Sequence, residues 1–243
     1  MQVVILCGGQ GTRAYPYTQS IPKALMEING IPIVEQVMRI YAKHGHTDFL
    51  LSCGYLKENI FEYFQQNRYG WNVQCVDTGA DADTGDRIYR LRDKLEGRFM
   101  ATYCDGLSDI DLDSVEQFHG AHGGIATLAG AAVRSQYGLV YSDDAQKVTG
   151  FEEKPILPDM WLNGGFFIFE QGVFEHWNGH NLERDVLPAL TERGDLFMYK
   201  HRGFWRSMDT YKDQQELNQL WESYSSGLEK TLVGAGRTPG TQA

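Results

Sequence analysis

A glycine-rich loop follows directly on a short apolar run at the start of the chain. The run is Val3–Leu6, and the chain then reads Cys7-Gly8-Gly9-Gln10-Gly11-Thr12-Arg13. A short, continuous apolar run predicts a strand that is buried on both faces. Glycines after such a strand let backbone N–H groups approach an anion closely, as in the phosphate sites of α/β proteins. The loop therefore favours an α/β fold with a phosphorylated ligand.

Strand-like and helix-like segments alternate along the first half of the chain. Further strands are predicted at 49–51, 71–76 and 99–103, and helices at 33–41, 56–64 and 88–95. This alternation predicts βαβ units and a Rossmann-like, mixed but mainly parallel sheet flanked by helices. The second half is less regular, with strands predicted at 125–133, 138–141, 148–152 and 161–169, and helices at 182–192 and 211–221.

Composition excludes several classes of protein. The net charge of −10 argues against binding to duplex nucleic acid or to an anionic membrane surface. No apolar run approaches the roughly 20 residues that cross a bilayer, and the chain begins without the pattern of a signal peptide. The four cysteines are widely spaced and include no C-x-x-C pair, which predicts buried thiols in a reducing compartment. We therefore expect a cytoplasmic protein.

The glycine loop has three general interpretations. A Walker A loop requires G-x-x-x-x-G-K-[ST], which the sequence lacks. A dinucleotide fingerprint nearly fits at Gly9-x-Gly11-x-x-Ala14, but the prolines Pro16 and Pro22 interrupt the helix that this design needs. That design also leaves the cations Arg13 and Lys23 without a role. A plain glycine turn with incidental surface cations is the third alternative.

Six stretches of the sequence resemble one enzyme family. They are Gly8–Arg13 with Pro22-Lys23, Val76–Gly79 with Thr84–Arg87, Thr102–Gly106, Asn163–Phe167, Gly203–Trp205 and Met208–Thr210. In order and spacing they resemble the sugar-phosphate nucleotidylyltransferases, and within them the glucose-1-phosphate cytidylyltransferases. The likeness runs from residue 1 to about residue 222. It implies a nucleotidyltransferase fold with a small β-rich sugar-binding part.

The resemblance implies a division of the chain. Residues 1–222 would form one domain, with a nucleotide-binding half at about 1–110 and a sugar-phosphate-binding half at about 111–222. Residues 223–243, rich in Gly, Ser and Thr, are expected to be a flexible tail.

The resemblance also implies the reaction. An oxygen of a sugar-1-phosphate would attack the α-phosphorus of a nucleoside triphosphate, giving a nucleotide sugar and pyrophosphate. Because the nucleophile is already an anion, no general base is needed, and catalysis depends on positioning and charge neutralisation. CTP and glucose-1-phosphate are the substrates expected, with Mg²⁺ as the cofactor. The expected partners are these small molecules and further copies of the chain in a homo-oligomer.

Roles for single residues follow from the family motifs. Asp105, which follows the strand 99–103, and Asp209 would hold Mg²⁺. Arg13, Lys23 and Asp105 would be the catalytic groups, with Arg13 on the leaving pyrophosphate and Lys23 on the α-phosphate. The nucleotide would contact the following set: Leu6, Gly8, Gly9, Gly11, Thr12, Arg13, Lys23, Gly79, Arg87 and Cys104. The sugar phosphate would contact another set: Glu153, Lys154, Asn163 and Gly164.

Alternatives remain for some of these residues. Asp105-Gly106 also fits a plain turn, and Arg87 also fits an exposed helical position. His119-x-x-His122 has metal-like spacing but no third ligand nearby, and Asn178-Gly179 breaks the helix that would align His176 with His180. Neither pair is therefore expected to bind metal.

Departures from the family pattern concern the substrate. The chain reads Ile21-Pro22-Lys23-Ala24 where the subgroup has Lys-Pro-Lys-Pro, so one cation is missing. Asp86 adds a negative charge beside the expected nucleotide, and Cys104 replaces a glycine. The segment between Phe64 and Trp71 is also short. UTP, dTTP or GTP and another sugar or cyclitol phosphate therefore stay open, as does a non-catalytic nucleotide-sugar sensor or an NAD-dependent enzyme.

Overall fold

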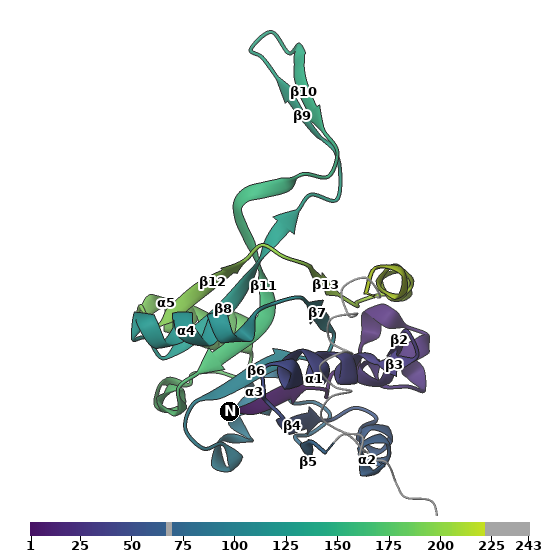
Figure 1. The fold of residues 1–243 in the computed structure, drawn as a ribbon, viewed down its shortest axis with the longest axis vertical. Coiled ribbons are helices and arrows are strands. Elements are labelled where there is room, and N and C mark those ends of the chain that lie inside the picture. Colours follow the sequence, from purple (N-terminus) through teal and green to yellow (C-terminus); the bar gives the residue numbers. More distant parts are fainter. Residues whose placement is uncertain (67–69, 222–243) are drawn as a thin grey trace, which may run out of the picture.

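A seven-stranded sheet lies at the centre of the described part of the chain (Figure 1). The computed structural model describes residues 1–66 and 70–221. The order of the strands in the sheet is β12-β8-β11-β6-β1-β4-β5. The strands are β1 (Gln2–Leu6), β4 (Asp48–Cys53), β5 (Asn72–Asp77), β6 (Phe99–Tyr103), β8 (Ala126–Arg134), β11 (Ile156–Phe169) and β12 (Leu196–His201).

Strand β11 is antiparallel to both of its neighbours, β6 and β8. The other neighbouring pairs of the sheet, β12–β8, β6–β1, β1–β4 and β4–β5, are parallel. The predicted fold class, a mixed and mainly parallel sheet flanked by helices, is therefore confirmed. The carboxyl ends of β1, β4, β5 and β6 meet at one edge, where α/β sheets bind their ligands.

Two apolar cores lie on the two faces of the sheet. Val3 and Ile5 of β1 point into one core, and Val4 and Leu6 point into the other, which is the period-2 alternation of a strand buried on both sides. The first core is covered by α1 (Ile33–Lys43), α2 (Lys57–Gln65) and α4 (Leu112–His122). The second is covered by α3 (Thr84–Tyr89) and α5 (Leu187–Glu192).

Several short elements complete the described residues. A small antiparallel pair joins β2 (Glu27–Ile28) to β3 (Ile31–Pro32), and another joins β7 (Gly106–Ser108) to β13 (Trp205–Ser207). Residues 211–221 are helical. Short 3₁₀ helices lie at Thr12–Ala14, Tyr17–Gln19, Lys23–Leu25, Arg92–Lys94 and Gln171–His176, and a π-helical turn lies at Leu182–Val186.

A two-stranded ribbon extends away from the rest of the molecule (Figure 1). It pairs β9 (Leu139–Ser142) with β10 (Val148–Glu152), and we call residues 135–155 the arm. Large apolar side chains of the arm are exposed: Tyr137, Val140, Tyr141, Val148 and Phe151. An isolated two-stranded ribbon is only marginally stable in water. Apolar side chains gathered on such a ribbon are unusual for a surface that faces solvent alone.

The structure departs from the sequence prediction at three elements. The helix predicted at 88–95 begins earlier, at Thr84, because Asp83 accepts a hydrogen bond from the Thr84 N–H, and it gives way to a 3₁₀ turn after Tyr89. The helix predicted at 182–192 begins with the π-helical turn. Strand β12 was not predicted from the sequence.

The division into one domain with two halves stays a prediction. The predicted tail, residues 223–243, lies outside the described residues, and so does part of the short segment between Phe64 and Trp71.

Candidate active site

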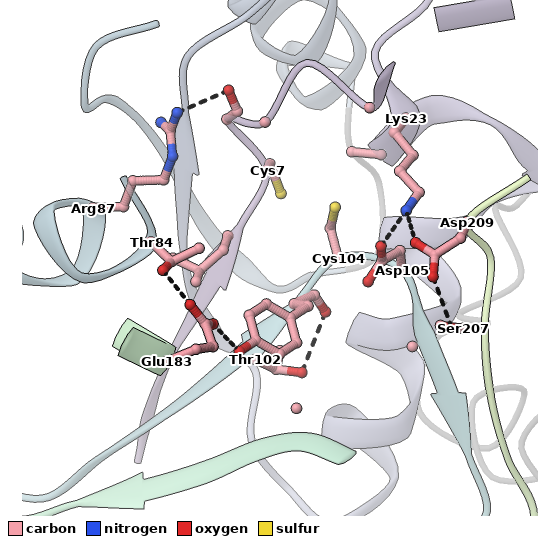
Figure 2. A pocket seen from close by; sticks show the side chains of 18 of the residues that line it. Cys7, Lys23, Thr84, Arg87, Thr102, Cys104, Asp105, Glu183, Ser207 and Asp209 are labelled. Atoms are coloured by element: carbon pink, nitrogen blue, oxygen red, sulfur yellow. Dashed lines mark hydrogen bonds and ion pairs between the residues drawn. The ribbon is translucent and has the colours of Figure 1, made fainter. Parts of the chain in front are cut away.

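A cavity of about 560 Å³ opens at the carboxyl ends of β1 and β6. The glycine loop forms one wall, and Cys104, Asp105, Ser207 and Asp209, which lie at the ends of β6 and β13, form another (Figure 2). The parallel pairing of Leu6 with Tyr103 places the loop after β1 beside the residues after β6. The position of the cavity therefore follows from the order of the strands.

Asp105 and Asp209, which are far apart in sequence, meet in this cavity. Asp105 follows β6, and Asp209 follows β13. The pairing of β13 with β7 places Ser207 opposite Gly106, and the Met208 N–H donates to the Asp105 carbonyl at 2.9 Å. Both carboxylates thus face one point.

Lys23 occupies that point. Its ammonium group donates to the carboxylate of Asp105 and, at 2.8 Å, to Oδ1 of Asp209 (Figure 2). Burial alone lowers the pKa of Lys23, but the charges and hydrogen bonds of the two aspartates outweigh it and raise the pKa above its usual value. Lys23 is therefore a cation throughout the physiological range.

Arg13 approaches Asp209 from the solvent side. Its guanidinium makes a forked contact with the carboxylate, at 3.0 Å and 2.9 Å, and its side chain is largely exposed. Burial raises the pKa of Asp209, but the opposing effect of Lys23 and then Arg13 is larger, and the pKa lies below its usual value. The site therefore holds two carboxylates and two cations in alternation, an arrangement that an incoming polyphosphate can exchange for its own contacts.

Two glycines of the loop are required by close approaches. Gly11 has φ +61°, and a Cβ there would lie 3.0 Å from the Thr18 side chain. A Cβ on Gly8 would lie 1.9 Å from Nη1 of Arg87. The backbone of the loop is thus free of side chains where it faces the cavity and where Arg87 supports it.

Arg87 holds the glycine loop from behind. Its guanidinium donates to the Gly8 carbonyl at 2.9 Å (Figure 2). It also donates to the Gly79 carbonyl and to the Thr78 hydroxyl, each at 3.0 Å. The residue is only 3% exposed, so the alternative of an exposed helical arginine is wrong. Burial lowers the pKa of the guanidinium, which nevertheless stays charged in proteins. Arg87 thus ties the loop after β1 to the loop after β5.

The opposite wall of the cavity carries a carboxylate that the sequence did not reveal. Glu183 accepts a hydrogen bond from Thr84 Oγ1 at 2.7 Å and another from the Tyr103 hydroxyl, and Asn163 Nδ2 donates to the same hydroxyl at 3.2 Å. Burial, followed by the charge of Glu183, raises the pKa of Tyr103, so the phenol stays protonated. Glu183 lies in a segment whose only sequence signal is helical periodicity, which explains why its role was missed.

Most residues predicted for the site line the cavity together. This set comprises Leu6, Gly8, Gly9, Gly11, Thr12, Arg13, Lys23, Arg87, Cys104, Asp105, Asn163, Gly164 and Asp209. Three predicted residues lie outside the lining. Gly79 accepts a hydrogen bond from Arg87, which does line the cavity, and Glu153 and Lys154 belong to the base of the arm. Lining residues that were not predicted include Cys7, Thr84, Tyr103, Glu183, Trp205 and Ser207.

Asp86, which was expected to add a negative charge beside the nucleotide, does not line the cavity. Its Oδ1 lies 2.9 Å from Nδ1 of His180. The hydrogen bond and charge of Asp86 raise the pKa of His180. His180 therefore pairs with the negative charge of Asp86 outside the cavity.

The histidine pair on α4 is engaged in local hydrogen bonds. His119 Nδ1 and His122 Nε2 both contact Thr127 Oγ1, at 2.8 Å and 2.6 Å. A separate group of potential ligands, His44, Asp111 and Asp113, lies outside the cavity, where Asp111 caps the start of α4.

Comparison with known proteins places this geometry in a family. A family model described as nucleotidyl transferase matches residues 2–223. The chain belongs to that family. A glucose-1-phosphate cytidylyltransferase of Salmonella typhi is 36% identical over 91% of this chain and 96% of its own length. A probable glucose-1-phosphate cytidylyltransferase of Bacillus subtilis is 35% identical over the same shares. The crystal structure of HddC from Yersinia pseudotuberculosis in complex with GMP-PN superimposes with a TM-score of 0.70 at 21% identity, covering 90% of this chain and 99% of that one, which shows a shared fold.

Membership of the nucleotidyl transferase family decides between the interpretations of the glycine loop. The loop is a nucleotidyltransferase loop and not a dinucleotide fingerprint, and the protein is a nucleotidyltransferase. Among the described residues, no helix is both long and apolar enough to span a membrane.

Proposed function

We propose that this chain is a glucose-1-phosphate cytidylyltransferase, which converts CTP and glucose-1-phosphate to CDP-glucose and pyrophosphate. The observation that carries the proposal is the match to two proteins of that name over nearly the whole of both chains. The stretches Val76–Gly79 and Thr84–Arg87, which resemble the cytidylyl subgroup, support it, because Arg87 and Thr84 both line the cavity.

The cations of the site supply the positioning that this reaction needs. In our proposal Lys23 contacts the α-phosphate and Arg13 contacts the phosphates that leave as pyrophosphate. Both already lie beside carboxylates that attract cations, so their side chains are held in the cavity before substrate arrives. Preorganised charges of this kind stabilise the transition state more than mobile ones.

Asp105 and Asp209 fit a divalent cation. The fit rests on their convergence on a single positive group, the ammonium of Lys23, from two different strand ends. Two carboxylates with the remaining positions left to water and phosphate are typical of Mg²⁺, which we propose as the cofactor. When bound, Mg²⁺ neutralises charge on the transferring phosphoryl group. The two aspartates would then hold the ion, and Lys23 would turn from them to the substrate.

We propose that the sugar phosphate enters between Asn163-Gly164 and the side of the cavity that carries Glu183 and Tyr103. Glu183 has acceptor capacity and Asn163 donor capacity for sugar hydroxyls, and both already share one hydrogen-bond network. The proposed contact of Glu153 and Lys154 with the sugar phosphate stays a prediction, since both lie outside this cavity in the single chain.

We also propose that the protein is a cytoplasmic homo-oligomer. Its four cysteines are free thiols, as expected in a reducing compartment. The exposed apolar side chains of the arm favour a second copy of the chain as the partner that covers them, because a ribbon with Phe151 64% exposed and Tyr137 77% exposed is poorly suited to water.

A product screen tests the proposed substrates. The purified chain is incubated with Mg²⁺, pyrophosphatase, each of five nucleoside triphosphates and several sugar-1-phosphates, and the products are identified by mass spectrometry. We expect CDP-glucose to exceed every other product. A different dominant nucleotide sugar would overturn the substrate assignment but keep the reaction. Absence of any product, with intact nucleotide binding, would overturn the assignment of this site as catalytic.

A further inference from the structure

The four cysteines, which are far apart in the sequence, lie in a row across the sheet. In the order β6, β1, β4, β5, one cysteine lies close to the carboxyl end of each strand: Cys104 and Cys7 directly after β6 and β1, and Cys53 and Cys75 within β4 and β5. All four belong to or pack against the core that α1 covers. The sequence predicted four buried thiols; three are buried and Cys75 is half-buried.

Cys7 and Cys104 are the members of the row that line the nucleotide cavity. They follow Leu6 and Tyr103, which are register partners, so they lie at the same level on neighbouring strands. Neighbouring strands are about 4.8 Å apart, and a Cα separation of about 4.4–6.8 Å permits a disulfide. Figure 2 shows the two sulfur atoms pointing toward one another inside the cavity.

The other two thiols lie outside the cavity lining. Cys53 is level with Cys7 but fully buried, and its thiol donates to the Leu51 carbonyl at 3.4 Å. Cys75 pairs in register with Leu51, two residues before Cys53, and its thiol is within hydrogen-bonding reach of the Cys53 thiol. A bond between Cys53 and Cys75 would therefore link no residue of the cavity lining.

We propose that Cys7 and Cys104 are a modification site, at which a peroxide forms a reversible disulfide that blocks the nucleotide cavity. Cys104, 8% exposed against 2% for Cys7, meets the peroxide first. Its sulfur attacks one peroxide oxygen, the O–O bond breaks, and a sulfenic acid and water result. The Cys7 sulfur then attacks the Cys104 sulfur and displaces a second water. Two thiols and one hydrogen peroxide thus give one disulfide and two waters, and a dithiol reductant reverses the change.

The consequence for nucleotide binding follows from the neighbours of the two cysteines. Cys7 begins the glycine loop, and Cys104 directly precedes Asp105. A bond of about 2.05 Å between the sulfurs draws these two segments together. Displacement of catalytic groups by about 1 Å typically costs about 10²-fold in rate. This consequence rests on the proposed function of the cavity, whereas formation of the bond does not.

The test follows the bond and the cavity separately. The reduced protein is treated with hydrogen peroxide, its remaining thiols are alkylated, and it is digested without reduction. We expect a Cys7–Cys104 linked peptide pair, lighter by two hydrogen atoms than the separate peptides, that disappears after dithiothreitol. In the same samples, CTP binding and CDP-glucose formation should fall about 10²-fold and return after reduction.

Two variants complete the design, each compared with its own untreated activity and CTP binding. Cys53→Ser is the matched control and should behave as the wild type. Cys7→Ser should give no linked peptide and no dithiothreitol-reversible loss of about 10²-fold.

A Cys7–Cys53 link, or peroxide oxidation of Cys104 without the Cys7 link, would overturn the modification site. The link with unchanged CTP binding and turnover would overturn the blockade. Because the link is read by mass, a protein that makes no CDP-glucose still tests the site.

Discussion

At the scale of the residue, Asp105 has a role that only its charge can fill. It shares the ammonium of Lys23 with Asp209, and it lies at the end of β6, where the chain enters the cavity. Asp105→Asn keeps the shape of the side chain but removes the charge. We expect kcat to fall by about 10²–10³-fold, since removing one preorganised electrostatic contact typically costs that much.

The control for this prediction separates charge at the site from charge elsewhere. Asp93 has a side chain that is 81% exposed and lies outside the cavity, so Asp93→Asn should leave kcat unchanged. Thermal unfolding of both variants should resemble that of the wild type. If Asp105→Asn turns over at the wild-type rate, the two aspartates do not hold the metal.

Arg87 is a positioning residue in our account. Arg87→Ala leaves the carbonyl groups of Gly8 and Gly79 without their buried donor, which we expect to lower the free energy of unfolding by about 3 kcal/mol. Because the glycine loop then loses its support, KM for the nucleotide should rise more than kcat falls. Urea unfolding and steady-state kinetics measure the two effects.

Arg184→Ala is the matched control, since Arg184 is exposed. It should change neither quantity. A variant Arg87→Ala that loses stability while keeping the wild-type KM would show that Arg87 supports the fold alone.

At the scale of the element, the arm has an exposed apolar surface that favours binding to a partner. Val140 and Val148 are each 59% exposed on its two strands. Exposed apolar side chains of this kind mark interaction sites more often than free surface. Replacing both by aspartate adds charge without disturbing a core, so we expect the fold to persist while the assembly dissociates. Light scattering coupled to size-exclusion chromatography measures the mass. An unchanged oligomer would exclude the arm from the interface, and a monomeric wild type would contradict the homo-oligomer.

The elements also show what a sequence can and cannot predict. Strands β1, β4 and β6 are buried on both faces, so their continuous apolar runs identify them. Strand β12 was missed because its residues are mostly half-buried and show no alternation. The family motifs identified Asp105 and Asp209, but no local pattern reports that β13 pairs with β7 and brings them together. The sequence likewise could not show that Lys154 lies outside the cavity, because tertiary structure sets the direction in which the arm extends.

At the scale of the whole molecule, three histidines connect stability to pH. His119 lies buried between Thr127 and Glu170, His46 is also buried, and His122 is half-buried. Burial is the largest influence on each and lowers its pKa below the usual value of 6.5. The folded protein therefore keeps these rings neutral at a pH where the unfolded chain binds protons.

The sign of the pH dependence follows from that difference. Between about pH 7 and pH 5 the unfolded chain binds more protons than the folded one, so the free energy of unfolding falls as the pH falls, by at most about 1.4 kcal/mol per pH unit for each histidine. Urea unfolding at pH 7.5 and pH 5.5 should show the loss, and His119→Gln should reduce the difference between the two. The exposed His180 has the opposite sign, because Asp86 raises its pKa and the pair stabilises the folded state below about pH 6.5. His180→Gln should therefore make the loss on acidification steeper, and equal slopes in all three proteins would contradict this assignment of the buried histidines.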